Sequence, residues 1–309
     1  RDFNEPVYAS SNYLIVTHKS LWAEAQDYAN YRSSIAGGGY NVLLVDVDEL
    51  YDQFAYGIRK NPLAIKNFAR FAYDNFTNTP EALFLLGKGY RAGESCSSWD
   101  NSYRYNTTFY ANTLIPGFGV PPTDILFTTF NNTNYKCFVP IGRLAARVPG
   151  DVSLYLDKVE DYEAAQAGEP QEWMKNILHF GGGSDIYQQQ VLAAYLKSYE
   201  DTLEGPSFGG YVRTFLKSST EPIEINQSDS LKYIINNGVS LLTFFGHGAG
   251  IGFDQSIDDP SAYDNYKKYP FLEANSCLAG DLYNETRTSS EEFVLIPNKG
   301  TIGYLASVG

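Results

Sequence analysis

Short apolar runs without polar alternation recur along this chain, and segments with helical spacing separate them. These runs read as strands at residues 13–17, 40–45, 81–86, 138–143, 176–180, 211–215, 241–245, 269–274 and 301–306. The segments between them read as helices at residues 20–33, 62–75, 152–165, 185–203 and 228–236. Strands that are apolar on both faces are typical of parallel sheets covered by helices, and right-handed crossovers join them. The chain is therefore expected to be an α/β protein with αβα layers.

The alternation of strands and helices starts twice. The first series ends at Gly168-Glu169-Pro170, and a new strand follows soon after. We therefore expect two adjacent subdomains, residues 1–168 and 169–309, each with a mostly parallel sheet. A helix that closes the second sheet is expected beyond Gly309, so this subdomain is expected to be truncated at its C-terminal end.

Composition excludes several classes of partner. The formal net charge is −13, whereas binding a phosphate backbone needs clustered Lys and Arg, so no nucleic-acid partner is expected. No apolar stretch is long enough for a membrane span. The three cysteines, Cys96, Cys137 and Cys277, form no CxxC pair, which argues against a zinc ribbon. In an oxidising compartment Cys96 and Cys137 can pair while Cys277 stays free, and the sequence leaves this pairing open.

Two successive apolar runs end in residues with reactive side chains. Gly246-His247-Gly248 closes one run and Asn275-Ser276-Cys277 closes the next. Because reactive groups of parallel sheets gather at the carboxyl ends of strands, we expect the imidazole and the thiol to meet at one edge. A histidine converts a neighbouring thiol into a thiolate nucleophile. The amides of Gly248 and Cys277 are candidate donors to an oxyanion, so acyl transfer is the predicted chemistry.

Structural interpretations of the same residues stand beside this one. A cysteine at the end of an apolar strand is most often a small buried hydrophobe. His179 lies inside a predicted strand and is interpreted as a core residue with its hydrogen bonds satisfied. Gly181-Gly182-Gly183 lies between a strand and a helix, but it lacks the spacing of a nucleotide-binding motif.

The sequence resembles the gingipain family of cysteine peptidases over nearly its whole length. The segments that carry the resemblance are residues 139–143, residues 238–242 leading into 246–248, residues 270–271 leading to Cys277, and residues 300–307. The resemblance implies a caspase-like fold with the catalytic pair in the second subdomain. It assigns Cys277 as the nucleophile, His247 as the general base, and the amides of Gly248 and Cys277 as the oxyanion hole.

At the position of the family's third catalytic residue, this sequence departs from the family pattern. Gingipains place an acid just after the strand that residues 176–180 resemble, but here that position falls on Gly182 or Gly183. Asp185 is the nearest carboxylate, and its segment resembles the one in which arginine-specific members anchor their substrate. Asp185 therefore has three open roles: it orients His247, lines the substrate pocket, or caps the helix that follows.

The resemblance also gives an expectation about cofactors and metal ions. No cofactor is required and no metal ligand is assigned. Asp254, Asp258 and Asp259 follow His247 closely; they suit either a structural calcium ion, as in gingipain relatives, or a solvated acidic loop.

The resulting prediction is a gingipain-type cysteine endopeptidase with a His-Cys dyad that acts through a thioester, by hydrolysis or transpeptidation. Residues 275–280, followed by residues 289–300, are similar to sortase-like members of the type IX secretion system. That similarity implies cargo processing, partners among the secretion components, and a secreted or bacterial cell-surface, outer-membrane-associated location. The rival is a non-catalytic peptidase-fold protein that binds or scaffolds polypeptides in the secretion machinery.

Overall fold

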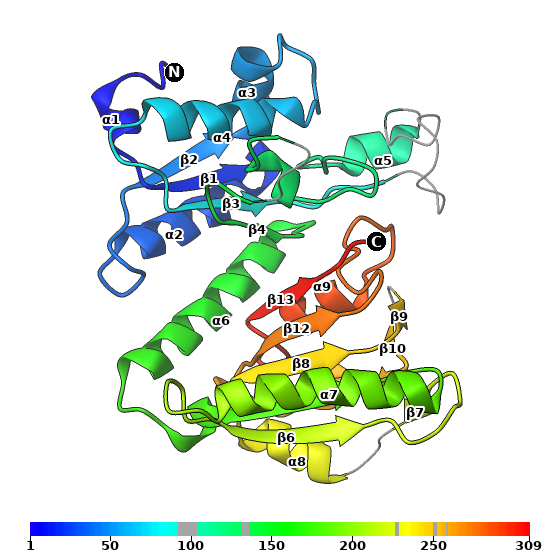
Figure 1. Cartoon of the computed structure of the whole chain (residues 1–309). Helices are drawn as coiled ribbons and strands as arrows, with labels where there is room; N and C mark the ends of the chain where they lie inside the picture. The colour runs from blue at the N-terminus through cyan, green and yellow to red at the C-terminus, as the bar shows by residue number, and fades with distance from the viewer. Residues whose placement is uncertain (92–103, 105, 132–135, 226–228, 250–251, 258) are drawn as a thin grey trace. The chain divides into compact units, whose positions relative to one another are not determined.

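The structure, a computed structural model, describes residues 1–91, 104, 106–131, 136–225, 229–249, 252–257 and 259–309. The chain divides into two compact units, coloured from blue to green and from green to red in Figure 1. Unit 1 comprises Arg1–Leu156 and Leu282–Glu285, and unit 2 comprises Asp157–Asp281 and Thr286–Gly309. The division falls inside α6 (Pro149–Ala167), an uninterrupted helix, rather than at the expected break after residue 168.

Unit 1 is built on a parallel sheet with the strand order β2-β1-β3-β4. Its strands are β1 (Tyr13–Thr17), β2 (Val42–Asp46), β3 (Ala82–Leu86) and β4 (Ile141–Leu144). Its helices are α1 (Pro6–Ala9), α2 (Trp22–Ser33), α3 (Val47–Phe54), α4 (Leu63–Asn75) and α5 (Thr107–Asn112), with short 3-10 turns at Lys19–Leu21 and Ile125–Phe127.

Helices cover both faces of this sheet (Figure 1). On one face, Leu50 of α3 and Phe68 of α4 pack with Leu14 and Leu83 of the strands in one buried cluster. On the other face, Tyr28 of α2 contacts the ring of Phe84 at 5.1 Å. The strands are buried on both sides because each face has its own helical layer, which explains their uninterrupted apolar runs.

Unit 2 contains a second parallel sheet with the strand order β13-β12-β8-β5-β6. Its strands are β5 (Asn176–Gly181), β6 (Tyr211–Leu216), β8 (Leu241–Phe245), β12 (Phe271–Asn275) and β13 (Gly303–Ala306). Smaller strands are β7 (Glu224–Ile225), β9 (Gly248–Ala249), β10 (Gly252–Phe253) and β11 (Gln255–Ser256). The helices are α7 (Ile186–Leu203), α8 (Asp229–Asn237) and α9 (Ser289–Leu295), with 3-10 turns at Glu172–Lys175 and Pro260–Ala262.

The second sheet is also a middle layer. Its buried cluster joins Phe180, Leu242 and Leu272 of three strands to Ile235 of α8 and Phe293 of α9. On the opposite face α7 packs over β5 and β6, as Figure 1 shows. The predicted fold class, α/β with two mostly parallel sheets between helices, is confirmed.

His179 of β5 departs from its sequence interpretation. The side chain is fully buried, as expected of a core residue. Neither ring nitrogen has a hydrogen-bond partner within the described chain, however, so the expectation of a satisfied histidine is wrong. Burial accordingly lowers the pKa of His179, because an apolar environment disfavours the charged imidazolium.

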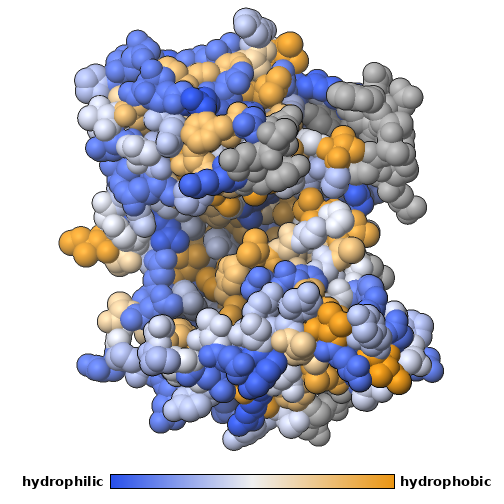
Figure 2. All heavy atoms as spheres, in the orientation of Figure 1, coloured by the Kyte–Doolittle hydropathy of each residue, from blue (hydrophilic) through white to orange (hydrophobic). Residues whose placement is uncertain are grey.

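Hydrophilic residues cover much of the face drawn in Figure 2, with hydrophobic ones scattered among them. Large exposed apolar side chains include Ile35, Val120, Ile186 and Ile223. Among the described helices, none combines the length and the hydrophobicity that crossing a membrane requires.

Candidate active site

His247 and Cys277 follow two neighbouring parallel strands at the same edge of the second sheet. In the register of β8 and β12, Phe245 pairs with Asn275, the last residue of each strand. The amide of Gly246 extends this alignment by donating to the Asn275 carbonyl at 3.3 Å. His247 and Cys277 each lie two residues further on, and both side chains are exposed. The structure thus brings the two candidate residues to one open edge.

Gly248 packs directly against the segment that carries the thiol. A Cβ atom at Gly248 would lie 2.1 Å from the hydroxyl oxygen of Ser276, the residue before Cys277. A Cβ at this position would force the Ser276 side chain to shift, so glycine lets the β9–β10 hairpin approach without a rearrangement. The glycine after His247 therefore has a steric reason that the sequence alone did not show.

The candidate oxyanion donors, the amides of Gly248 and Cys277, differ from their neighbours in their hydrogen bonding. His247 and Asp254 flank the β9–β10 pair, where the Asp254 amide donates to the His247 carbonyl at 2.9 Å and Gly248 pairs with Phe253. This alternation puts Gly248 in a non-hydrogen-bonded position, with its N–H directed away from β10. The Cys277 amide donates to no acceptor in the described chain. Neither N–H group is therefore bonded to a backbone acceptor within the described chain.

The turn after Cys277 has a constrained backbone. Leu278 adopts a left-handed conformation with a φ of 56°, which is uncommon for a residue with a Cβ and is often found at functional sites. The Gly280 amide donates to the Ser307 carbonyl at 2.7 Å, and the Asp281 amide donates to the Leu278 carbonyl at 3.1 Å. These bonds fix the turn that presents Cys277.

The carboxylate of Asp254 binds the backbone amide of His247. Its Oδ1 accepts a hydrogen bond from the His247 amide at 3.1 Å, and its Oδ2 accepts one from the Gly183 amide at 2.8 Å. Lys217 Nζ lies 3.6 Å from Oδ2, and its side chain is only 1% exposed. The carboxylate also occupies the space beside Gly182 and Gly246, where added Cβ atoms would lie 2.1 and 2.7 Å from Oδ1. A buried ion pair thus ties together the ends of β5, β6 and β8.

The imidazole of His247 is held from α7. Its Nε2 lies 2.8 Å from Oε1 of Gln188, and Gln188 is partly buried in the first turn of the helix. Asp185 is the N-cap of α7 and accepts from the Gln188 amide at 2.9 Å. A neutral amide rather than a carboxylate therefore contacts the candidate base.

The comparisons with known proteins decide the family. A family model described as peptidase family C25 matches residues 8–309. The chain belongs to peptidase family C25. This is the gingipain family of cysteine peptidases, so the resemblance seen in the sequence is confirmed. A search of the curated proteins found no match.

Solved structures of gingipain R and of a further protease share the fold. The crystal structure of the Arg-specific cysteine proteinase gingipain R (RgpB) superposes with a TM-score of 0.63 at 18% identity, covering 96% of this chain and 62% of that one. A complex of the pro- and mature domains of Porphyromonas gingivalis RgpB gives 0.65 at 15% identity, covering 94% and 63%. A structure described as a protease gives 0.67 at 17% identity, covering 96% and 58%. The chain thus spans about three fifths of each of these proteins.

Asp185 and the acidic residues after His247 have defined places in this C25 site. Asp185 lies at the start of α7 as the cap that one interpretation expected, and its described contacts do not include His247. The solvated acidic loop is wrong for Asp254, which is 7% exposed and ion-paired. Asp259 caps the turn Pro260–Ala262, while Asp258 lies outside the described residues. Among the described residues, no group of three potential ligands could hold a metal ion, and the calcium ion stays a prediction.

Cys96 also lies outside the described residues, and Cys137, its possible disulfide partner, is a free thiol in the structure. Sequence reasoning missed Gln188, Lys217 and the buried role of Asp254. Gln188 follows the cap by three residues, a helical spacing that signals its place in the first turn. Nothing in the sequence signals the pairing of Lys217 with Asp254, because it depends on how β6 and the β9–β10 hairpin meet.

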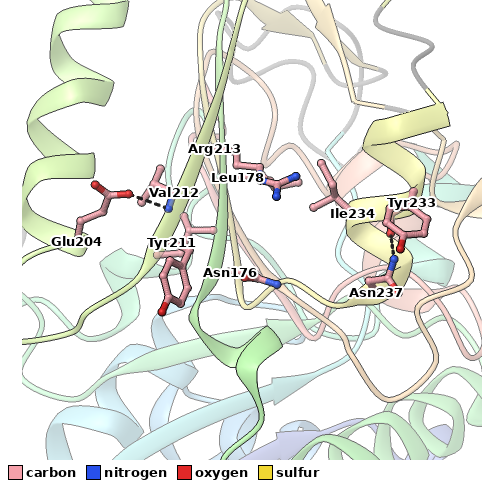
Figure 3. Close-up of a pocket in the computed structure, with 10 residues that line it drawn as sticks. Asn176, Leu178, Glu204, Tyr211, Val212, Arg213, Tyr233, Ile234 and Asn237 are labelled. Carbon is pink, nitrogen blue, oxygen red and sulfur yellow. Dashed lines mark hydrogen bonds between the residues drawn. The ribbon is translucent and has the colours of Figure 1, made fainter.

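An open pocket of about 500 Å³ lies elsewhere in unit 2, at the amino ends of β5 and β6. Its lining includes Asn176, Tyr211, Arg213 and Ile234, which Figure 3 shows around the hollow between the strands and α8. Ligands of parallel sheets bind at the carboxyl ends of strands. This pocket is therefore at the wrong end of the sheet to hold a substrate of His247 and Cys277.

Proposed function

We propose that the chain is a cysteine peptidase with Cys277 as the nucleophile and His247 as the general base. The observation that carries the proposal is the register of β8 and β12, which aligns Phe245 with Asn275 at one sheet edge. The exposure of both reactive side chains supports access by a polypeptide. Membership of family C25 supports the same reaction class.

The proposed reaction forms an acyl-enzyme. His247 takes the proton of the Cys277 thiol, and the thiolate attacks the carbonyl carbon of a peptide bond. The resulting oxyanion accepts hydrogen bonds from the amides of Gly248 and Cys277. The tetrahedral species then collapses, the C–N bond breaks, and the imidazolium gives its proton to the leaving amine. A thioester on Cys277 remains.

The second half of the reaction decides the product. Attack by water on the thioester gives hydrolysis, whereas attack by an amine gives transpeptidation. His247 accepts the proton of the incoming nucleophile, the C–S bond breaks, and the imidazolium returns the proton to the Cys277 sulfur. None of these steps uses a cofactor.

Asp185 is proposed to contribute to substrate selection. One carboxylate oxygen caps α7, and the side chain is exposed at the same helix end that holds the His247 ring. An exposed carboxylate there favours a basic side chain in the substrate. Asp185→Asn is therefore expected to weaken cleavage after Arg or Lys and to leave cleavage after neutral residues unchanged. Equal effects on both substrate sets would exclude this role.

A sortase-like role in type IX secretion stays a prediction, supported by the resemblance of residues 275–280 and 289–300. It includes processing of secreted cargo, contacts with other secretion components and a secreted or bacterial cell-surface location. The rival is a non-catalytic binding or scaffold protein of the same machinery. It differs from the peptidase in one testable respect, since it binds polypeptides without cleaving them.

Incubation with a mixture of peptides, read by mass spectrometry, tests the proposal. We expect new peptide termini with the unaltered protein and none with Cys277→Ala or His247→Ala. Added amines distinguish the two outcomes, since transpeptidation yields amine adducts. Peptides that bind without being cut, with equal affinity for the unaltered protein and Cys277→Ala, would support the rival.

A further inference from the structure

The amide of Gln188 has a defined orientation. Its Oε1 accepts a hydrogen bond from the Ser184 backbone amide at 2.9 Å and contacts the Ser184 hydroxyl at 3.0 Å. A backbone N–H can only donate, so the atom facing it must be the amide oxygen and not the amide nitrogen. This contact settles which end of the Gln188 amide points to the histidine.

The protonation of the imidazole follows from that orientation. His247 Nε2 lies 2.8 Å from the same oxygen. An amide oxygen has no proton to give, so Nε2 must carry the hydrogen of this bond. In a neutral imidazole the other ring nitrogen, Nδ1, then holds a lone pair.

We propose that Gln188 is a positioning residue that holds His247 as the Nε2–H tautomer, so that Nδ1 is the atom that takes the Cys277 proton. This inference rests on the proposed function. The proton moves from the Cys277 sulfur to Nδ1, and Nε2–H keeps its bond to Gln188 throughout. When the tetrahedral species collapses, Nδ1–H passes the proton to the leaving amine. The tautomer is thus set before substrate arrives.

The rest of α7 supports a positioning role. Asp185 accepts from the Gln188 backbone amide, and Ser184 holds the side-chain oxygen, so both ends of Gln188 are restrained. Restraint of this kind reduces the entropy lost when the imidazole is ordered. The side chain is only partly buried, so its removal leaves no closed cavity in the core.

Nitrogen NMR of histidine-labelled protein tests the tautomer directly. The chain has three histidines, and His247→Ala assigns the signal. The measurement uses Cys277→Ala protein, so that no thiolate pairs with the ring. The pH is about 8.5, at which an ordinary imidazole is neutral. We expect His247 protonated at Nε2, and a mixture of tautomers in Gln188→Ala. Gln188→Glu, which keeps an acceptor oxygen, should restore the Nε2–H form.

Gln190, an exposed neighbour on the same helix, provides the matched control. In protein with Cys277 intact, Gln188→Ala should slow alkylation of this thiol and lower kcat by about tenfold or more, with KM little changed. Gln190→Ala should change neither the rates nor the tautomer. A proton on Nδ1 in the unaltered ring, or a Gln188→Ala ring like the unaltered one, would overturn the inference. The NMR result stands even if Cys277 proves unreactive, which would refute only the proposed function.

Discussion

Replacing Asp254 by alanine should destabilise unit 2 more than most single substitutions. The carboxylate is 7% exposed, accepts from the His247 and Gly183 amides, and lies 3.6 Å from Lys217 Nζ. Its removal leaves a buried ammonium without its partner, a change that typically costs about 3–5 kcal/mol. At roughly 1.4 kcal/mol per factor of ten, the protection of β8 amides against exchange should fall by about two to three and a half powers of ten.

Hydrogen exchange read by mass spectrometry is the suitable assay, because it reports each unit separately. Peptides covering β5 and β8 should lose protection in Asp254→Ala, whereas those covering β1 and β3 should not. Lys217→Met should cost less, since the carboxylate keeps its two amide donors. The double variant should be more stable than the sum of single effects predicts, by about 1–3 kcal/mol.

Two results would refute this reasoning. One is a loss below about 1 kcal/mol for Asp254→Ala, the scale of a single ordinary hydrogen bond. The other is a double variant whose loss equals the sum of the single losses within about 0.5 kcal/mol. Either would mean that the carboxylate and the ammonium do not interact in the folded protein.

Three further substitutions probe other parts of the account. Gly182→Ala should destabilise unit 2 and slow Cys277 alkylation, because its Cβ would lie 2.1 Å from Asp254 Oδ1. Gly252→Ala, whose Cβ would have no described non-adjacent residue within 4 Å, is the neutral control. Equal denaturation midpoints for the two would contradict the steric argument. Arg143 donates to both oxygens of Asp124 and to the carbonyls of Gly87, Ile115 and Pro116, so Arg143→Lys should destabilise unit 1 by about 2–4 kcal/mol; a loss under about 1 kcal/mol in exchange of β3 amides would rule this out. Burial lowers the pKa of Lys158 to about 7, against about 10.4 when unfolded. The unfolded state then binds one more proton between about pH 7.5 and 9, so the free energy of unfolding of unit 2 should rise by about 1.4 kcal/mol per pH unit relative to Lys158→Met. Parallel pH profiles in urea titrations would show that Lys158 stays charged in the fold.

The sequence predicted the sheets well because their strands carry local signals. Residues 241–245 were expected as a strand and form β8 with the same bounds, and residues 269–274 correspond closely to β12. Apolar runs of this length, closed by glycine or asparagine, read as buried strands without knowledge of their neighbours. The meeting of His247 and Cys277 at one edge then follows from parallel pairing.

Helix α3 was missed although its pattern was present. Val47, Leu50 and Tyr51 are buried at helical spacing, and Asp46 caps the helix. Because β2 runs directly into this helix with no loop, the apolar strand obscures the start of the helical pattern. The Asp46 cap followed by Glu49 at the third helical position was the available signal.

The burial of single polar residues could not be predicted from the neighbouring sequence. Asp254 reads as part of an acidic loop because Asp258 and Asp259 follow it. Its burial depends on Gly182 and Gly246, which leave room for the carboxylate, and on Lys217, which supplies charge. These partners come from different strands, so only the assembled sheet brings them together.

The measurement that tests the central claim most directly is labelling with peptidyl acyloxymethyl ketones, with the modified residue mapped by mass spectrometry. We predict a selective adduct at Cys277 with some peptides, lost in Cys277→Ala and slowed by about 10²-fold or more in His247→Ala. Cys137, which is partly buried, serves as the internal reference. Labelling of Cys277 no faster than Cys137, or unchanged in His247→Ala, would contradict the account.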